Sequence, residues 1–522
     1  MLSKDSNTLE ALSHWQNFKQ KLIIKSILVG FFSGLIAVLY RVTLEKMEHL
    51  SQNIYKFQRT NYWFIPFWFI FLIVLALIIG FIVKKEPMIS GSGIPQVEGT
   101  VLGPLKMNWL KVAISKFIGG ALSILGGLSL GREGPSIQIG AAIGQGVSKG
   151  LNSDNNEERY LITSGASAGL AAAFNAPLAG VIFSLEEVHK SFSPLILLST
   201  MTAAITSDFI SKLFFGFNTA FKFENLSALP LKSYGYLIIL GVIIGIGGVI
   251  FNLLLVKALN LYNNQKWLPP QFRIIIPFII AGILGLTIPQ VLGGGHSLIM
   301  SIIEKNPTLK VLVILLILKF LFTMVSFGSG APGGIFLPLL VIGALIGCIY
   351  GNILANLGLI SSDYIHNFMI LAMAGYLTAI VRAPITGAVL ITEMTGSLTH
   401  LLSLSIVSII GYLVADFLGS KPIYETLLHR LLNKEKDNNF ITNERKKTIL
   451  EIPVSICSYL DNKQIKDIKW PENCLLVGIQ RSGIEIIPKG DTYILGGDYL
   501  VVLADEDKSS NITEYLMKMA YE

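Results

Sequence analysis

The sequence predicts an all-α polytopic membrane protein with two inverted repeats of tilted, broken helices, followed by a small α/β or β-rich cytoplasmic C-terminal domain. Three observations lead to this fold class. Of the 522 residues, 52% are hydrophobic and only 14% are charged, whereas soluble proteins carry about 25% charged residues. Glycine- and proline-containing motifs of the first half return in the second half. After about residue 450, the composition becomes that of a soluble protein.

Residues 1–21 are polar and mixed in charge, which predicts a short amphipathic, cytoplasmic lead-in. The first apolar run, Leu22 to Tyr40, has no small-residue cleavage pattern, so we expect no cleavable signal peptide. The net charge of +7 is typical of cytoplasmic loops rich in Lys and Arg and does not favour nucleic-acid binding. Cys348, Cys457 and Cys474 form no CxxC pair, so neither a disulfide framework nor a metal site is expected.

The membrane domain is predicted to span residues 22–432. Within it, the run 320–362 has no charged residue, is too long for one helix and contains both glycine and proline. It predicts short, broken or re-entrant helices enclosed by protein. The apolar segments lie at roughly 22–40, 62–83, 109–126, 159–184, 194–214, 235–258, 272–290, 310–325, 334–357, 367–391 and 401–418.

An internal repeat of about 200 residues runs through this domain. The clearest pair is AAFNAPLAGVIFSLEE (172–187) against AIVRAPITGAVLITEM (379–394). Gly91-Ser92-Gly93 likewise returns as Gly293-Gly294-Gly295. Because several motif pairs keep the same order, a shared Gly/Pro bias of membrane helices explains them poorly. Paired halves with broken helices are typical of transporters, whose substrate lies near the midplane. Converging helix N-termini favour an anionic substrate.

Gly131-Arg132-Glu133-Gly134-Pro135 places a carboxylate among helix breakers in strongly apolar surroundings. Intramembrane carboxylates are rare and usually line an ion path or pair with a cation. The glycines and proline end one helix where another can begin, which leaves backbone N–H groups free to bind an anion. The alternative is a solvated turn between two spans. The internal repeat favours the anion site.

Three motifs carry a resemblance to a known family. Gly91-Ser92-Gly93-Ile94-Pro95, Gly131-Arg132-Glu133-Gly134-Pro135 and Gly333-Gly334-Ile335-Phe336-Leu337-Pro338 look like the signature motifs of the CLC family of chloride channels and proton-coupled chloride antiporters. The resemblance covers roughly residues 20–432. It implies a homodimer in the bilayer of a bacterial inner membrane, multi-pass, with cytoplasmic termini and one anion path per subunit. It implies no cofactor for transport.

The resemblance also implies an anion-binding set. Ser92 matches the residue whose hydroxyl donates to the central anion, although a helix N-cap is the alternative role. Ile335 and Phe336 match the residues whose backbone N–H groups bind the same anion. Tyr424 matches the tyrosine that closes the inner side, with an interfacial anchor as the alternative. Glu98 is expected to be structural, satisfying helix-start amides or bridging to Lys116.

Glu133 matches the family's gating glutamate and proton carrier. An ionised carboxylate can occupy an anion site built of N–H donors, and chloride can enter once protonation removes that charge. Glu187 falls on the position of the antiporters' internal proton-transfer glutamate, with a membrane-edge carboxylate as the alternative. Adjacent carboxylates on a helix face different ways. Glu186 matches Glu393 in the repeat, which predicts a structural role, whereas Glu187 has Met394 in its place.

The function predicted from these residues is chloride/proton antiport. The alternative is a passive voltage- or proton-gated chloride channel of the same fold. An enzyme is not expected, because the sequence has no HExxH motif and no GxSxG motif after a strand. A membrane sensor would not need Ser92, Glu133 and Tyr424 together.

The C-terminal domain is predicted at 451–522, after a charged linker at 433–450. Strand-like segments lie at Cys474–Gln480, Gly483–Ile487 and Tyr499–Leu503. The domain is too short for the paired CBS modules of larger family members, and it resembles the RCK C-terminal (TrkA-C type) domain. That resemblance implies a regulatory unit and raises the hypothesis of a cyclic dinucleotide ligand. The alternative is a cap that stabilises the dimer.

Overall fold

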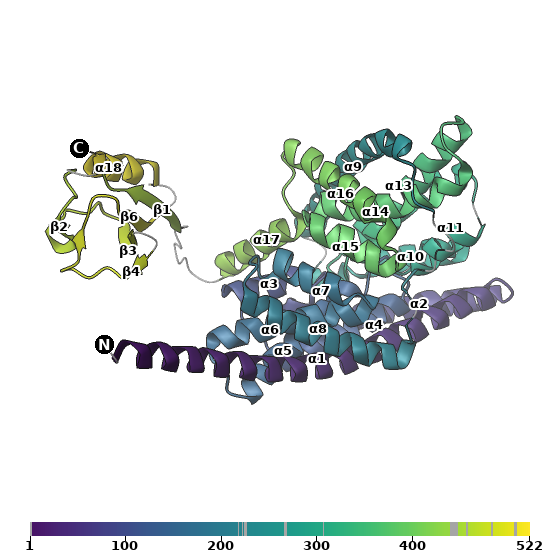
Figure 1. Ribbon diagram of the computed structural model, residues 1–522. Helices are drawn as coiled ribbons and strands as arrows, with labels where there is room; N and C mark the ends of the chain where they lie inside the picture. The colour runs from purple at the N-terminus through teal and green to yellow at the C-terminus, as the bar shows by residue number, and fades with distance from the viewer. Residues whose placement is uncertain are drawn as a thin grey trace. The chain divides into compact units, whose positions relative to one another are not determined.

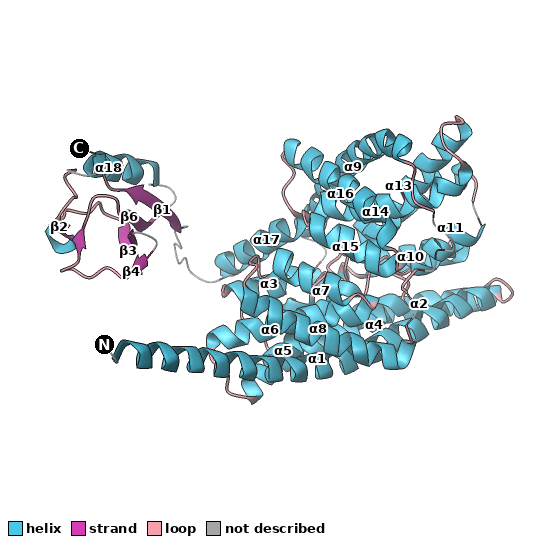
Figure 2. Ribbon diagram, viewed as in Figure 1, coloured by secondary structure: helices cyan, strands magenta, loops and turns pink. Residues whose placement is uncertain are grey.

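The computed structural model describes residues 3–217, 219–221, 223, 227–265, 269–305, 307–438, 447–455, 458–481, 484–505 and 509–521. The chain divides into two compact units, Met1–Leu432 and Asn433–Glu522. The first is helical, and the second contains the strands (Figures 1 and 2). Cys348 and Cys474 are free thiols, whereas Cys457 lies outside the described residues.

The helices of the first unit follow the same order twice. The first series is α1 (Ser3–Gln58), α2 (Ile65–Lys85), α3 (Ile94–Leu102), α4 (Trp109–Leu125), α5 (Glu133–Gly150), α6 (Asn155–Phe174), α7 (Pro177–Phe183) and α8 (Pro194–Phe215). The second series is α9 (Tyr234–Asn264), α10 (Ile275–Thr287), α11 (His296–Lys305), α12 (Leu309–Gly328), α13 (Phe336–Asn356), α14 (Ile365–Val381), α15 (Pro384–Thr395) and α16 (Leu401–Phe417). Helix α17 (Ile423–Asn438) follows the second series.

The two halves meet at equivalent residues. The backbone N–H of Gly131 donates to the carbonyl of Gly334 at 2.6 Å, and the N–H of Gly334 donates back at 2.9 Å. Helices α7 and α15, which are also equivalent, pack against each other. Gly131 and Gly334 thus form a reciprocal, antiparallel pair. Because the two residues are equivalent in the repeat, an approximate two-fold axis must pass beside this pair. The predicted pair of inverted repeats is therefore present.

Two fully buried lysines fix the same turn in each half. Lys116 Nζ donates to the carbonyls of Ile89 and Gly91 at 2.8 and 2.7 Å. Its counterpart Lys319 makes the equivalent pair of bonds ahead of α11, at 3.0 and 2.7 Å. A buried ammonium needs such partners, because an unpaired buried charge is costly. Both lysines therefore hold the backbone that precedes a short helix.

Nine helical segments among the described residues are long and apolar enough to cross a membrane. Two predicted segments, 159–184 and 367–391, each form two helices in the structure. The breaks fall at Asn175 and Arg382, which occupy the left-handed region with φ of 55° and 75°. Asn tolerates this conformation better than most residues, but Arg does not. Both residues precede an Ala-Pro pair, and the proline begins the next helix.

The close packing of α5 on α6 depends on glycine. A Cβ built on Gly140 would collide with the carbonyl of Gly165, and a Cβ on Gly165 would collide with that of Gly140. Small residues let helix backbones approach closely in membranes, where van der Waals packing drives association. This contact holds α5, and with it Glu133, against the rest of the first half.

Two expectations about helix length need correction. The lead-in predicted at 1–21 is not a separate element, because α1 runs without a break from Ser3 to Gln58. Up to Asn356, the charge-free run 320–362 has one break, which lies between α12 and α13. Helix α13 itself is an uninterrupted helix of 21 residues. Composition indicated that this run was buried, but it did not distinguish one long helix from several short ones.

The second unit contains a four-stranded antiparallel sheet of order β1-β6-β3-β4 and a two-stranded pair, β2-β5 (Figure 2). The three predicted strands fall on β3, β4 and β6, although Gly483 lies outside the described residues. The bounds are β1 (Lys447–Pro453), β2 (Lys463–Gln464), β3 (Cys474–Arg481), β4 (Ile484–Ile486), β5 (Tyr493–Ile494), β6 (Tyr499–Asp505) and α18 (Ser509–Tyr521).

Two elements extend into the stretch predicted as linker, 433–450. Helix α17 continues to Asn438, and β1 begins at Lys447. Helix α18 was not predicted either. Its buried residues Ile512, Leu516 and Ala520 lie four positions apart, which is the spacing of one helix face. They join a core with β6 residues Leu500 and Val502, so α18 covers one face of the sheet.

Candidate anion and proton site

Ser92 lies in the turn before α3, and its side chain is only 2% exposed. Its Oγ accepts a hydrogen bond from the N–H of Ile94 at 3.3 Å. The alternative predicted from sequence, a bond to helix-start amides, is therefore made. A serine hydroxyl also carries one donor, and this donor remains available to an anion while Oγ accepts from the helix.

The starts of three helices converge near Ser92. The backbones are so close that an added side chain would meet a neighbouring backbone. A Cβ atom added to Gly134, in the first turn of α5, would lie 2.7 Å from the carbonyl oxygen of Ser92. A Cβ atom added to Gly334 would lie 3.1 Å from the backbone nitrogen of Gly134. Ile335 and Phe336, where α13 begins, are fully buried. The first N–H groups of a helix have no partner within it and form its positive end. The structure therefore brings together the three predicted motifs around a site suited to an anion.

The Glu133 carboxylate is fully buried, and neither oxygen has a hydrogen-bond partner of good geometry among the residues that the structure describes. A Cβ on Gly131 would contact Glu133 Oε2 and the N–H nitrogen of Leu337. The carboxylate thus lies between the two paired segments at the two-fold axis. Burying a carboxylate without partners is costly, so its charge state is coupled to what else occupies the site.

Tyr424, at the start of α17, is fully buried, and its hydroxyl has no hydrogen-bond partner among the described residues. Glu133 and Glu187 are both near enough to act electrostatically on this hydroxyl. An interfacial anchor would expose its hydroxyl to water, which this side chain does not do. Tyr424 is therefore a buried tyrosine within electrostatic reach of both predicted proton-carrying carboxylates, and its hydroxyl has no hydrogen-bond partner among the described residues.

Glu186 and Glu393 cap each other's helices. Glu393 Oε2 accepts from the N–H of Ala179 at 2.7 Å, at the start of α7. Glu186 Oε2 accepts from the N–H and the hydroxyl of Thr386 at 2.9 and 2.7 Å, at the start of α15. A carboxylate at a helix N-terminus is stabilised by the N–H groups and the dipole there. The reciprocal contacts agree with the structural role expected for this pair.

Glu187 makes neither of these capping contacts. It lies in a π-helical turn, Ser184–Val188, and is 5% exposed. Such π-bulges occur frequently at functional sites. Lys190, Glu98 and Glu425 lie near enough to act on it electrostatically. The two adjacent glutamates thus differ in their contacts: Glu186 caps a helix, and Glu187 does not.

Glu98 has a different partner from the one considered in the sequence analysis. Its Oε1 pairs with Lys190 Nζ at 2.7 Å, and Lys116 binds backbone carbonyls instead. The other carboxylate oxygen, Oε2, is buried and has no hydrogen-bond partner within the described part of the chain. Sequence reasoning missed Lys190, because a lysine four residues beyond Glu186 carries no motif that would connect it to α3.

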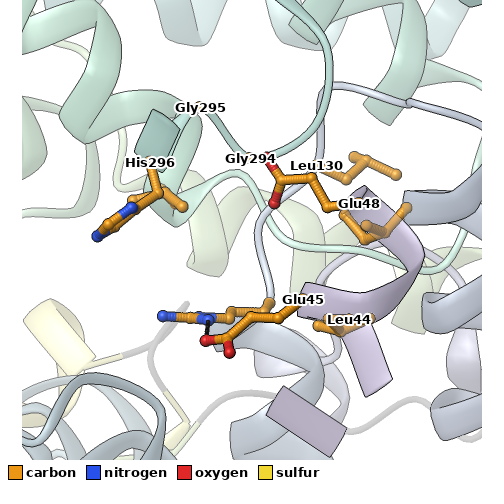
Figure 3. Close-up of a pocket in the computed structure, with 10 residues that line it drawn as sticks. Leu44, Glu45, Glu48, Leu130, Gly294, Gly295 and His296 are labelled. Carbon is orange, nitrogen blue, oxygen red and sulfur yellow. Dashed lines mark hydrogen bonds and ion pairs between the residues drawn. The ribbon is translucent and has the colours of Figure 1, made fainter. Parts of the chain in front are cut away.

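A pocket opens beside Glu133, and sequence reasoning also missed it (Figure 3). The residues that line it are Leu44, Glu45, Glu48, Ile124, Leu130, Arg132, Gly294, Gly295, His296 and Leu337. Arg132 Nη1 pairs with Glu45 Oε1 at 3.3 Å across the pocket edge. The sequence signal was the spacing of Glu45 and Glu48, which places two carboxylates on one face of α1.

Comparison with family models gives two matches. Residues 75–416 match the model described as voltage gated chloride channel, and residues 449–517 match the TrkA-C domain.

Curated relatives resemble nearly the whole helical unit. The chain is 33% identical over 426 residues to the H(+)/Cl(-) exchange transporter ClcA of Vibrio cholerae serotype O1, covering 80% of this chain and 90% of that protein. It is 34% identical over 432 residues to the transporter of the same name from Klebsiella pneumoniae subsp. pneumoniae, with the same coverage of 80% and 90%.

Solved structures show the same likeness. A slow cyanobacterial Cl-/H+ antiporter has a TM-score of 0.74 and 30% identity, over 80% of this chain and 99% of that one. A CLC-type fluoride/proton antiporter has a TM-score of 0.65 and 23% identity, over 78% and 97% of the two chains. The second likeness concerns the fold alone.

Proposed function

This chain belongs to the voltage gated chloride channel family, and we propose that it is a multi-pass membrane protein that exchanges chloride for protons. The observation that carries the proposal is the buried carboxylate of Glu187, which caps neither α7 nor α15, beside the capping glutamate Glu186. A passive channel of the same fold would need a gate but no second proton carrier. The relatives named as exchange transporters also favour antiport over a channel.

Chloride would bind where the motifs converge. Ser92 would donate its hydroxyl proton, and the N–H groups of Ile335 and Phe336 would donate from the positive end of α13. Tyr424 would donate from the other side, since its hydroxyl has no other partner among the described residues. Each of these groups is buried, so water competes little with the anion.

Glu133 would act as gate and outer proton carrier. In its ionised form, the carboxylate repels chloride and can itself occupy the anion site. Protonation removes the charge, and chloride can then pass. Glu187 would exchange protons with the other side of the membrane through a route that does not use the anion path. Tyr424 lies within electrostatic reach of both carboxylates, which supports a chloride site close to both proton carriers.

The remaining assignments follow from family membership and form part of the proposal. The protein would be a homodimer in the bilayer of a bacterial inner membrane, with both termini in the cytoplasm and one anion path per subunit. Its activity would be transport and not enzymatic catalysis. These assignments are supported by the length of the match to the exchange transporters, which covers 90% of those proteins.

For the C-terminal unit, we propose a regulatory role with a cyclic dinucleotide as ligand. The match of residues 449–517 to the TrkA-C domain supports this role. Isothermal titration of the purified full-length protein with cyclic di-AMP should give saturable heat. If no heat appears at high micromolar ligand, the unit does not bind this nucleotide, and a dimer-stabilising cap becomes the better account.

The test of antiport is proton uptake into proteoliposomes driven by a chloride gradient. The native protein should move protons uphill, and Glu187→Gln should move chloride without protons. Glutamine keeps the shape of the side chain but cannot carry a proton. Chloride flux without proton movement in the native protein would refute antiport and would leave the channel alternative standing.

A further inference from the structure

The pocket beside Glu133 contains charges that the proposed mechanism does not use. Glu45 and Glu48 come from α1 (Figure 3), and Arg132, which also lines the pocket, immediately precedes Glu133 in the sequence. His296 lies across the pocket, where its Nε2 bonds to the carbonyl of Ala220 at 2.8 Å. An anion transporter with carboxylates at such a pocket needs an explanation, because fixed negative charge repels the transported ion.

One oxygen of Glu45 lies between two guanidinium groups. Glu45 Oε1 accepts from Arg41 Nε at 3.1 Å and from Arg132 Nη1 at 3.3 Å. The Glu45 side chain is 44% exposed, whereas the two arginine side chains are only 16% and 15% exposed. The carboxylate can therefore move away while the arginines stay fixed. Guanidinium groups are well suited to bind small oxyanions and other anions in place of a carboxylate.

The Arg41 guanidinium is held by contacts other than the one to Glu45. It stacks on the Phe215 ring at 3.8 Å and donates to Asn175 Oδ1 at 3.2 Å. The backbone at Arg132 is fixed because the neighbouring Gly131 pairs with Gly334, and the Arg132 side chain is only 15% exposed. The Arg132 Nε is buried and has no partner in the described structure. The pair of cations would thus keep a donor for an anion if Glu45 withdrew.

The position of this pair connects it to the transport path. Leu130 and Leu337 form part of the pocket wall, and the N–H nitrogen of Leu337 lies beside the Glu133 carboxylate. An ion held by Arg132 would therefore be one step from the gate.

We propose that Arg41 and Arg132 form a subsite for a small monovalent anion at the mouth of this pocket, and that the Glu45 carboxylate fills the subsite when no anion is bound. The inference rests on the proposed function, which makes chloride the anion. Chloride would displace Glu45 here before it meets Glu133. Glu45 then acts as a competing anion, and removing its charge strengthens chloride binding at the pocket.

Glu48 provides a matched control. It comes from the same helix and lines the same pocket. Its Oε1 accepts from the Ser297 hydroxyl at 3.4 Å and from the Gln52 amide at 3.5 Å. In the described structure, Arg41 and Arg132 pair with Glu45 and not with Glu48. Glu45→Gln and Glu48→Gln each remove one negative charge from the pocket, so their long-range electrostatic effects are matched. Only Glu45→Gln removes the competitor of the anion.

The experiment is the chloride dependence of flux in proteoliposomes for the native protein, Glu45→Gln and Glu48→Gln. We expect Glu45→Gln to lower the half-saturating chloride concentration by about two- to fivefold, the range expected for a half-exposed ion pair. Glu48→Gln should change it by much less. Arg41→Gln is a second variant, in which the loss of one cation should raise the half-saturating concentration.

Equal shifts in the two glutamine variants would indicate a general field effect and would overturn the subsite. An unchanged or raised half-saturating concentration in Glu45→Gln, or no change in Arg41→Gln, would overturn it as well. The same liposomes report proton movement separately. Chloride flux without proton uptake in the native protein would refute antiport, while the expected shifts would still support the subsite.

Discussion

Replacement of Lys190 by methionine should weaken the helical unit and slow proton exchange, because Lys190 is the ion-pair partner of a buried carboxylate. Glu98 is 1% exposed and pairs with Lys190 at 2.7 Å. Removal of one member of a fully buried pair costs about 3–5 kcal/mol, and exposed pairs contribute about 0.2–1 kcal/mol. Since the Lys190 side chain is 36% exposed, we expect a loss of about 1–2 kcal/mol, between these two limits.

The functional consequence follows from the position of Glu187. Lys190 also acts electrostatically on Glu187, so Lys190→Met leaves two neighbouring carboxylates without their shared cation. Like charges disfavour simultaneous ionisation, and Glu187 should then release its proton less readily. Proton uptake in proteoliposomes should fall more than chloride flux does. His429 and Glu425 also face Glu98, so both stay unchanged in the experiment.

A double-mutant cycle provides the assay. Unfolding in mixed micelles with increasing sodium dodecyl sulfate gives the free energies of unfolding for Lys190→Met, Glu98→Gln and the double variant. In the double variant the neutral amide no longer needs a cation, so Lys190→Met should cost little there. The coupling free energy should be about 1–2 kcal/mol. Losses that add within about 0.5 kcal/mol would show that the pair is not coupled, and the reasoning would be refuted.

Three further predictions concern the other carboxylates and the C-terminal unit. Glu133→Gln should abolish proton coupling and leave chloride flux that no longer responds to pH, as measured in proteoliposomes. Glu186→Gln should lower the free energy of unfolding by about 1–3 kcal/mol, because it weakens the bonds to Thr386, yet it should retain proton coupling. Arg481→Ala should destabilise the C-terminal unit, because the guanidinium donates to both carboxylate oxygens of buried Asp498 at 2.8 and 2.7 Å. Limited proteolysis should show faster cleavage of this unit in Arg481→Ala, with Arg481→Lys as a milder control.

The bonds to Asp498 explain why the last prediction concerns a structural pair. They raise the pKa of the Arg481 guanidinium, and Asp498 Oδ2 also accepts from the N–H of Leu495 at 2.8 Å. The carboxylate thus connects β3 to the turn before β6. Intact resistance to proteolysis in Arg481→Ala would show that Asp498 finds other partners.

The sequence was informative where a residue type itself carries the chemistry. Glu133, among glycines in an apolar run, could be predicted as a gate from the sequence, and the structure buries it fully at the meeting point of the two halves. The pairing of Glu186 with Glu393 in the repeat indicated a structural role, but it did not indicate that Glu186 caps α15 and Glu393 caps α7. Such a contact depends on how α7 and α15 pack, and the spacing along the chain does not determine that packing.

Residues that act through distant contacts were missed for the same reason. Lys190 matters because it reaches Glu98, and Glu45 matters because it lies between two arginines. The break at Arg382 was missed because arginine rarely adopts a positive φ. There the surrounding structure holds the strained backbone, with the guanidinium donating to the carbonyl of Ser420 at 2.7 Å.

The internal repeat separates the scaffold of this protein from its chemistry. Residues that are alike in the two halves hold the backbone in place: the paired Gly131 and Gly334, the buried lysines and the capping glutamates. Residues with proposed transport roles break the symmetry. Ser92 corresponds to Gly294, Glu133 to Phe336 and Glu187 to Met394. A symmetric scaffold brings equivalent helix starts to one axis, but a gate on one side and a proton carrier on the other require side chains that differ. Substitutions at the symmetric positions should therefore reduce stability first, and substitutions at the asymmetric positions should alter coupling first.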